Sequence, residues 1–201
     1  MKNIIIIALF LTSINTYSQG KAEITDVEDF QNELNEQYAD ENKSPLTKED
    51  FKTFKSLEFF PIDTGYRVIA KLKFFKNSKP INMKTTTDRI AVYKVYATAT
   101  FKINGEKHVL RIYQSEQLLL TQDFDDHLFL PFTDESNGSS SYGGGRFIDL
   151  TIPDKDTIII DFNKAYNPYC AYSDRYSCAI PPKANHLNTE ILAGVRAYKE
   201  H

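Results

Sequence analysis

The chain has 201 residues, and its 24 lysines and arginines are outnumbered by 27 aspartates and glutamates, which gives a formal net charge of −3. Nothing in this composition is basic enough to make nucleic acid a default partner, so we expect no nucleic-acid partner. The length suits a single domain with a sizeable buried core.

Residues 1–18 have the layout of a secretory signal peptide. Lys2 supplies the positive charge, residues 4–11 form an apolar run, and residues 16–18 form a small-x-small cleavage pattern. The run is shorter than the roughly 20 residues that a membrane-spanning helix needs. We therefore expect cleavage between Ser18 and Gln19, export to the periplasm or the medium, and no membrane insertion of the mature chain.

The pattern of residues 19–57 predicts a polar segment of short helices. In TDVEDFQNELNEQYADEN, apolar side chains recur at helical spacing: Val27, Phe30, Leu34 and Tyr38. In the following SPLTKEDFKTF, Thr47 and Asp50 resemble a capping box, which marks the start of a second helix. Both helices expose mostly charge, so we expect them to pack on a larger unit.

Residues 58–201 change to the alternating pattern of strands. Residues 66–75 alternate, and residues 89–114 form two alternating runs around Asn104-Gly105, which is the strongest short-range signal of a β-hairpin. Further strands are expected in residues 126–132, 146–152 and 156–162, whereas residues 187–198 fit a strand or a terminal helix. These elements predict a mainly β (α+β) fold, an antiparallel barrel or sandwich with short N-terminal helices.

The standard catalytic motifs are absent from the sequence. There is no G-x-S-x-G, H-E-x-x-H, Walker A or G-x-G-x-x-G before a helix, so we expect no cofactor and no metal. His127 lies beside Asp125 and Asp126, which would suit an acid–base pair, but an exposed acidic turn is the better interpretation.

A glycine-rich turn, residues 137–146, is the first candidate for a binding element. The amides of Gly143, Gly144 and Gly145 can converge on an anion, and Arg146 adds a charge suited to a carboxylate or phosphate. The alternative is a flexible loop in which Arg146 pairs with Asp149 or Asp161.

The cysteine loop, residues 161–185, is the second candidate. Cys170 and Cys178 lack the C-x-x-C spacing of thioredoxin-like sites, and zinc would need more nearby ligands. A disulfide is favoured, and closing this loop would stabilise the fold by roughly 2.6 kcal/mol. Such a loop can form a binding wall, unless its polar side chains only bond their own turns and cover the core's edge. Its candidate ligand-binding residues are Asp161, Asn163, Tyr166, Asn167 and Asn185.

Three quoted segments carry a resemblance to a known family. PFTDESNGSSSYGGGRFIDL, IDFNKAYNPYCAYSDRYSCAIPPKANHLNTEILAGV and ELNEQYADENKSPLTKEDFKTFKSLEFFPID resemble the bacterial and archaeal family catalogued as domain of unknown function 1684, in its secreted Bacteroidetes-type form. One departure is Ala179, where the family usually has proline. The resemblance implies no activity, but it implies a signature: Thr133, Asp134, Tyr142, Gly144, Gly145, Arg146, Asp161, Asn163, Tyr166, Asn167, Cys170, Cys178, Pro182 and Asn185.

Three hypotheses follow, in this order. The first is an exported binding module that holds a small polar or anionic ligand between the glycine-rich turn and the cysteine loop, with Thr133 and Asp134 among the contacts. The second is a structural or interaction module without a pocket. The third is a hydrolase with Asp161 or Asp134 as general base and Tyr142 or Tyr166 as acid.

Overall fold

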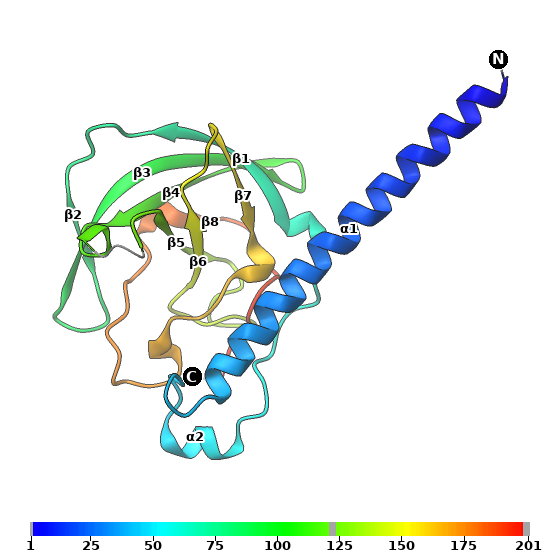
Figure 1. The fold of residues 1–201 in the computed structure, drawn as a ribbon. Coiled ribbons are helices and arrows are strands. Elements are labelled where there is room, and N and C mark those ends of the chain that lie inside the picture. Colours follow the sequence, from blue (N-terminus) through cyan, green and yellow to red (C-terminus); the bar gives the residue numbers. More distant parts are fainter. Residues whose placement is uncertain (1, 121–123, 199–201) are drawn as a thin grey trace.

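The computed structural model describes residues 2–120 and 124–198, which form two helices and eight strands (Figure 1). The helices are α1 Lys2–Ala39 and α2 Lys48–Thr53, and the strands are β1 Arg67–Phe74, β2 Ile81–Lys84, β3 Ile90–Ile103, β4 Glu106–Ser115, β5 His127–Asp134, β6 Arg146–Thr151, β7 Thr157–Asp161 and β8 His186–Leu187.

The sheet is predominantly antiparallel and curls into an incomplete barrel. Its order is β6-β5-β4-β3-β1-β7, with β2 paired to β3 and β8 added in parallel to β5. β6 and β7 follow one another in the chain but lie at opposite ends of this order, which leaves a seam between them (Figure 1). The prediction of a mainly β fold is confirmed.

The β3–β4 hairpin follows its sequence signal. Asn104 and Gly105 have φ values of 51° and 83°, and Ile103 pairs with Glu106 across the two-residue turn. Both residues tolerate the positive φ that this turn needs, so the turn chemistry determines the register of the longest strand pair.

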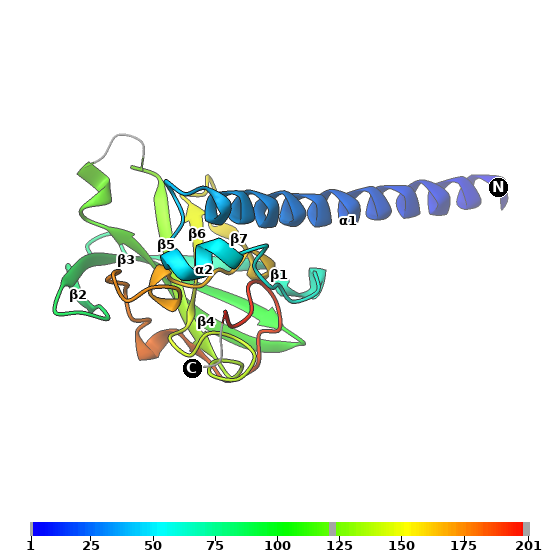
Figure 2. The same ribbon diagram turned by 90° about the horizontal axis from the view of Figure 1, so that it is seen from below.

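Helix α1 is longer than expected and projects far beyond the body (Figures 1 and 2). It runs without interruption through Ser18 and Gln19, so the proposed cleavage point lies within a helical segment and stays a prediction. The C-terminal part of α1 packs against the body through Val27 and Tyr38, which are buried. No helix in the described ranges is long and apolar enough to cross a membrane.

Helix α2 begins as the capping signal predicts. The hydroxyl of Thr47 accepts a hydrogen bond from the amide of Asp50 at 3.1 Å. Leu46 is buried in the same apolar cluster that Phe51 packs against, which is the arrangement of a hydrophobic staple.

The C-terminal segment is neither of the two elements expected. Residues 188–198 run in an extended path with a single isolated bridge, between Val195 and Phe59. Ile191, Ala193 and Val195 are buried, so the alternation correctly indicated burial. A buried arginine, described below, binds three of its carbonyl groups.

Candidate functional site

Arg146 and Asp134 form a buried ion pair rather than a ligand contact. Their side chains are 0% exposed, and Nη2 of Arg146 donates to Asp134 Oδ2 at 2.9 Å. The same guanidinium donates to the carbonyls of Ile191, Ala193 and Val195. The expectation that Arg146 holds an anionic ligand is therefore corrected: both Nη atoms bind protein groups, and its acidic partner is neither Asp149 nor Asp161. Its buried Nε has no hydrogen-bond partner among the described residues.

The glycine-rich turn packs closely against neighbouring segments at Gly145. Gly145 has φ +85°, and a Cβ there would lie 2.6 Å from the Phe132 carbonyl oxygen and 2.9 Å from Pro181. Gly143 and Gly144 are exposed, and none of the three glycines lines either large cavity described below. The turn does touch the cysteine loop, through Gly145 beside Pro181 and through Tyr142 beside Cys170, but no residue of the turn lines either large cavity.

Three asparagines of the cysteine loop connect distant backbone segments. Asn185 accepts from the Arg111 amide and donates to the carbonyls of Arg111 and Pro131. Asn163 bonds both backbone groups of Asp63, and Asn167 donates to the Arg196 carbonyl. All three side chains are buried, and because Asn163 and Asn185 bond backbone through both ends of their amides, their geometry supports a structural role. Asn167 bonds backbone through Nδ2, whereas its Oδ1 has no hydrogen-bond partner among the described residues.

Thr133 and Asp161 also have protein partners. Thr133 Oγ1 lies 3.0 Å from Nδ1 of His186. Asp161 accepts hydrogen bonds from the backbone and side-chain nitrogens of Asn163 and lies 3.9 Å from Arg67. Asp134 accepts hydrogen bonds from Arg146, Ser136 and Ile191, so both candidate carboxylates of the hydrolase hypothesis are engaged in structural contacts.

Tyr166 lies in the wall of a cavity together with acid–base groups, and Asp161, another predicted residue, lines the second cavity described below. The Tyr166 hydroxyl donates to Asp149 Oδ2 at 2.7 Å, and Nε2 of His127 donates to Asp149 Oδ1 at 2.9 Å. Burial raises the pKa of Tyr166 well above its ordinary value, so the phenol stays protonated. The hydrogen bond to Asp149 raises the pKa of His127. We call this hydrogen-bonded chain the His127–Asp149–Tyr166 relay.

The relay lies in the wall of an aromatic cavity of about 690 Å3. Six aromatic side chains line it: Phe30, Tyr93, Phe129, Phe147, Tyr166 and Tyr169. Tyr93 stacks on Phe129 at a centroid distance of 5.4 Å, and Phe147 meets Phe129 edge-on at 4.8 Å. The polar lining groups are Gln37, Arg89, His127, Asp149, Ser177 and Cys178, so a few polar groups interrupt an apolar wall, as in small-molecule sites.

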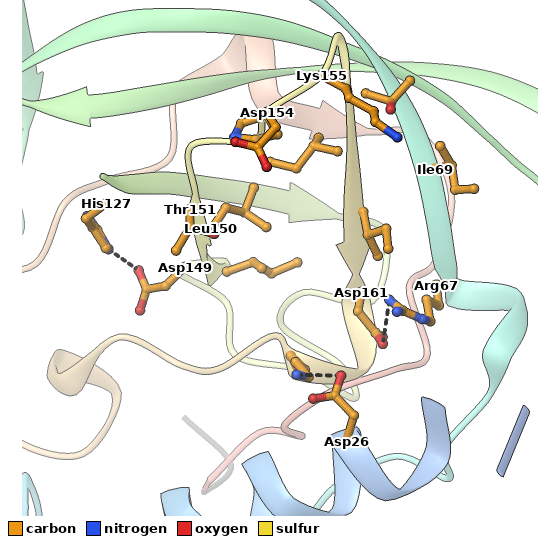
Figure 3. A pocket seen from close by; sticks show the side chains of 16 residues that line it. Asp26, Arg67, Ile69, His127, Asp149, Leu150, Thr151, Asp154, Lys155 and Asp161 are labelled. Atoms are coloured by element: carbon orange, nitrogen blue, oxygen red, sulfur yellow. Dashed lines mark hydrogen bonds and ion pairs between the residues drawn. The ribbon is translucent and has the colours of Figure 1, made fainter. Parts of the chain in front are cut away.

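A second cavity of about 680 Å3 opens at the seam between β6 and β7 (Figure 3). Most charges around this seam cavity are already paired: Arg67 with Asp161, and Lys164 with Asp26 at 2.8 Å. His127 and Asp149 line both cavities, so this pair forms part of the partition between them. No phenylalanine or tyrosine of the described residues lines the seam cavity, so it offers no phenyl or phenol ring to a ligand and is the weaker candidate.

Helix α1 contributes to the walls of both cavities. Asp26 borders the seam cavity, whereas Phe30, Leu34 and Gln37 border the aromatic cavity. These residues are spaced by three or four along the helix and so share one face. Gln37 also donates a hydrogen bond to the hydroxyl of Tyr169 and thereby ties the helix to the cysteine loop.

The sequence signals for this site were incomplete. The sequence suggested an acid–base pair between His127 and the adjacent Asp125 or Asp126. In the structure its partner is Asp149, which lies on the neighbouring strand. Arg89 and the aromatic residues of β3, β5 and β6 carried no local motif. Their convergence depends on strand register, in which Phe129 pairs with Asp149 across β5 and β6.

Stability should depend on pH through His127. Because the hydrogen bond to Asp149 raises its folded-state pKa above the ordinary 6.5, the stabilisation is complete below about pH 6.5 and is lost as pH rises through the folded value. Asp149 is 49% exposed, so the effect should be small, about 0.2–1 kcal/mol. Urea denaturation of wild type and His127→Gln at pH 5.5 to 8.5 checks this. If the free energy of unfolding changed with pH equally in wild type and in His127→Gln, the prediction would be wrong.

Comparisons with known proteins agree with the motifs. The model of the family described as "Protein of unknown function (DUF1684)" matches residues 52–196. The solution NMR structure of an uncharacterized protein from Haloarcula marismortui is similar, with a TM-score of 0.72 and 33% sequence identity over 92% of this chain and 99% of that chain. A search of curated proteins finds no match.

Proposed function

This chain belongs to the DUF1684 family of proteins of unknown function, and on that premise we propose that it is a binding protein whose aromatic cavity holds a small, planar ligand with a polar or anionic group. The observation that carries the proposal is the position of the His127–Asp149–Tyr166 relay in the wall of that cavity. The volume of about 690 Å3 falls within the usual range of small-molecule sites.

The aromatic lining favours a ligand with a flat apolar part. The faces and edges of Tyr93, Phe129 and Phe147 offer stacked and edge-on contacts to a ring. Such contacts contribute through buried area and ring geometry and need no charge. They account for the planar part of the proposed ligand.

Arg89 supplies the preference for an anionic group. Its guanidinium donates to the carbonyl and hydroxyl of Ser177, both uncharged, and no carboxylate in the described ranges forms an ion pair with it. A carboxylate or phosphate on the ligand would complete this pairing. His127 adds positive charge when protonated, offset by Asp149.

The binding proposal can be tested with defined probes: 4-hydroxybenzoate, indole-3-acetate and phenyl phosphate, with neutral benzyl alcohol for comparison. Calorimetric titration should show saturable binding of at least one charged probe, and Arg89→Gln should weaken it at least about tenfold, as expected for a charge-assisted hydrogen bond. The affinity for benzyl alcohol should be the same in Arg89→Gln as in wild type. Lys107→Gln, which removes an exposed charge from the β3–β4 hairpin, serves as the matched control.

Two outcomes would overturn the proposal. One is the absence of binding by every probe at about ten millimolar. The other is equal loss of affinity in Arg89→Gln and Lys107→Gln, since that would reflect net charge rather than a site.

The rival hypotheses are weaker on this geometry. A structural module without a pocket predicts a filled surface between the glycine-rich turn and the cysteine loop, and the buried Arg146–Asp134 pair agrees with it at that place. The aromatic cavity lies elsewhere, and it is what favours a binding function. A hydrolase that uses Asp161 or Asp134 would have to release these carboxylates from Asn163 and Arg146. If the protein is an enzyme, His127 held by Asp149 is the better general base.

We further propose that the protein acts outside the cytoplasm, with Cys170 and Cys178 joined by a disulfide after export. Residues 1–18 and the even cysteine count support this proposal. Expression of the full chain with its own leader should yield a periplasmic or secreted protein that begins at Gln19. Recovery of an uncleaved chain from the cytoplasm would contradict export.

A further inference from the structure

Charge is distributed unevenly along the chain, although its net value is small. Residues 67–115, from the start of β1 to the end of β4, contain 11 lysines and arginines and two acidic residues, whereas the rest of the chain contains 13 and 25. The formal net charge is therefore +9 in the first set and −12 in the second. Such asymmetry within one chain indicates a surface for nucleic acid or for a membrane.

The strand register gathers five of these cations on the outer face of β1, β3 and β4. Lys73 lies opposite Thr98 and Thr98 opposite Arg111, while Lys102 lies opposite Lys107. The side chains that alternate with them point into the buried core. We call this surface the basic face, and its cations are Lys71, Lys73, Lys102, Lys107 and Arg111.

The five cations of the basic face are exposed, and none of them forms an ion pair within residues 2–120 and 124–198. None lines the aromatic cavity or the seam cavity. Their Cα atoms are separated by about 7 Å along one strand and by about 10 Å across two strand spacings. Charges spread in this way suit an extended anionic surface better than one small anion.

The composition of the basic face favours diffuse attraction. Four of its five cations are lysines, whose compact charge lacks the planar fork with which arginine binds a single phosphate or a base edge. Lysines on flexible stems can instead follow the phosphate groups of a broad surface. The partner is therefore expected to present many negative charges over an area rather than one at a fixed position.

Aliphatic side chains lie among these cations and distinguish a bilayer from other polyanions. Ile69 and Ile159 face each other across β1 and β7 and are 74% and 46% exposed, and Val109, opposite Thr100, is 45% exposed. Binding to a bilayer surface combines charge attraction with the burial of such apolar groups. A nucleic-acid backbone would gain from the cations alone.

We propose that the basic face binds the surface of an anionic phospholipid bilayer, with the five cations at the lipid phosphates and Ile69, Val109 and Ile159 in the interfacial layer. This contact is peripheral and inserts no helix. It does not depend on the ligand proposed for the aromatic cavity. Figure 1 shows β1, β3 and β4 on the side of the body opposite α2, so a control surface is available at α2.

Sedimentation with vesicles tests this proposal. Wild type should bind vesicles of phosphatidylcholine with one third phosphatidylglycerol more tightly than vesicles of phosphatidylcholine alone, and 0.5 M NaCl should remove the difference. Lys71→Gln/Lys73→Gln/Arg111→Gln should weaken binding to the anionic vesicles at least about tenfold, since each cation contributes roughly a factor of five. All proteins are made as the full chain, so any effect of an uncleaved leader is the same in each.

The matched control is Lys48→Gln/Lys52→Gln/Lys55→Gln, which removes three exposed lysines on or directly after α2. It makes the same change in net charge, and it should leave binding to the anionic vesicles within about twofold of wild type. Thermal denaturation checks that both triple variants fold. Equal losses in the two variants, or equal binding of wild type to neutral and anionic vesicles, would overturn the proposal.

A second variant separates a bilayer from a soluble polyanion. Ile69→Gln/Val109→Gln keeps every charge and should weaken binding to the anionic vesicles at least about fivefold, because less apolar area is buried at the interface. Wild type should bind a DNA duplex more weakly than these vesicles. If it bound the duplex more tightly, or if Ile69→Gln/Val109→Gln bound the vesicles as wild type does, the partner would not be a bilayer.

Discussion

Replacing Arg146 with alanine is expected to destabilise the protein by about 3–5 kcal/mol, because it leaves the Asp134 carboxylate buried without its partner. The carbonyls of Ile191, Ala193 and Val195 lose their donor at the same time. For a chain of this length, the loss corresponds to a Tm lower by roughly 6–20 °C. Urea denaturation followed by circular dichroism measures it.

Two further variants make this prediction specific. Arg111→Ala removes an exposed arginine from β4 and should change stability by less than about 0.5 kcal/mol. The double variant Asp134→Ala/Arg146→Ala should be less destabilised than the sum of the single variants, because neither charge is then left alone. Equal effects of Arg146→Ala and Arg111→Ala would show that the buried pair does not stabilise the fold.

The second large effect is expected at Gly194. It has φ +79°, and an added Cβ would lie 2.5 Å from the Ala165 carbonyl oxygen and 2.8 Å from that of Phe162. The segment cannot easily move away, since the Phe60 amide donates to Gly194 and the Val195 amide donates to Ala165. Gly194→Ala should therefore cost about 2–5 kcal/mol, as the sum of backbone strain and overpacking.

Gly138 provides the matched control for Gly194. Its φ is +80°, almost the same, but a Cβ there would have no atom within 4 Å. Gly138→Ala should therefore show the backbone cost alone, about 1–2 kcal/mol. If urea denaturation showed the same loss of stability in both variants, the close contacts around Gly194 would not explain the cost of Gly194→Ala.

The fold was predictable where its signals are local. Asn104-Gly105 specified the β3–β4 hairpin, and Thr47 specified the start of α2, because turn and cap chemistry act over a few residues. The short strands β2 and β8 were not predicted. β8 is two residues long and pairs in parallel with β5, which no local pattern encodes.

The candidate site was predictable only in part. The cysteine loop was expected to contribute ligand-binding side chains, and of its candidate ligand-binding residues only Tyr166 lines the aromatic cavity, beside Cys178 of the same loop. Arg146 and Asn185 carry polar groups that suggest binding, and both bind the backbone of distant segments instead. Residue type alone could not distinguish these roles, because a buried polar side chain has the same chemistry whether its partner is a ligand or a carbonyl group.

The buried polar residues explain how an incomplete barrel holds its irregular segments. Residues 188–198 make almost no ladder, and Arg146 supplies the hydrogen bonds that a neighbouring strand would otherwise provide. Asn185 does the same for the end of the cysteine loop against β4 and β5. These contacts hold the loop that forms one wall of the aromatic cavity, and so connect the fold to the proposed site.

The measurement that tests the central claim most directly is a titration of 15N-labelled protein with indole-3-acetate and with phenyl phosphate, followed by amide chemical shifts. Binding in the aromatic cavity predicts saturable shifts that concentrate at residues 89–93, 127–129, 147–149 and 166–169. Shifts centred on residues 143–146, or the absence of saturable shifts with either probe, would contradict it.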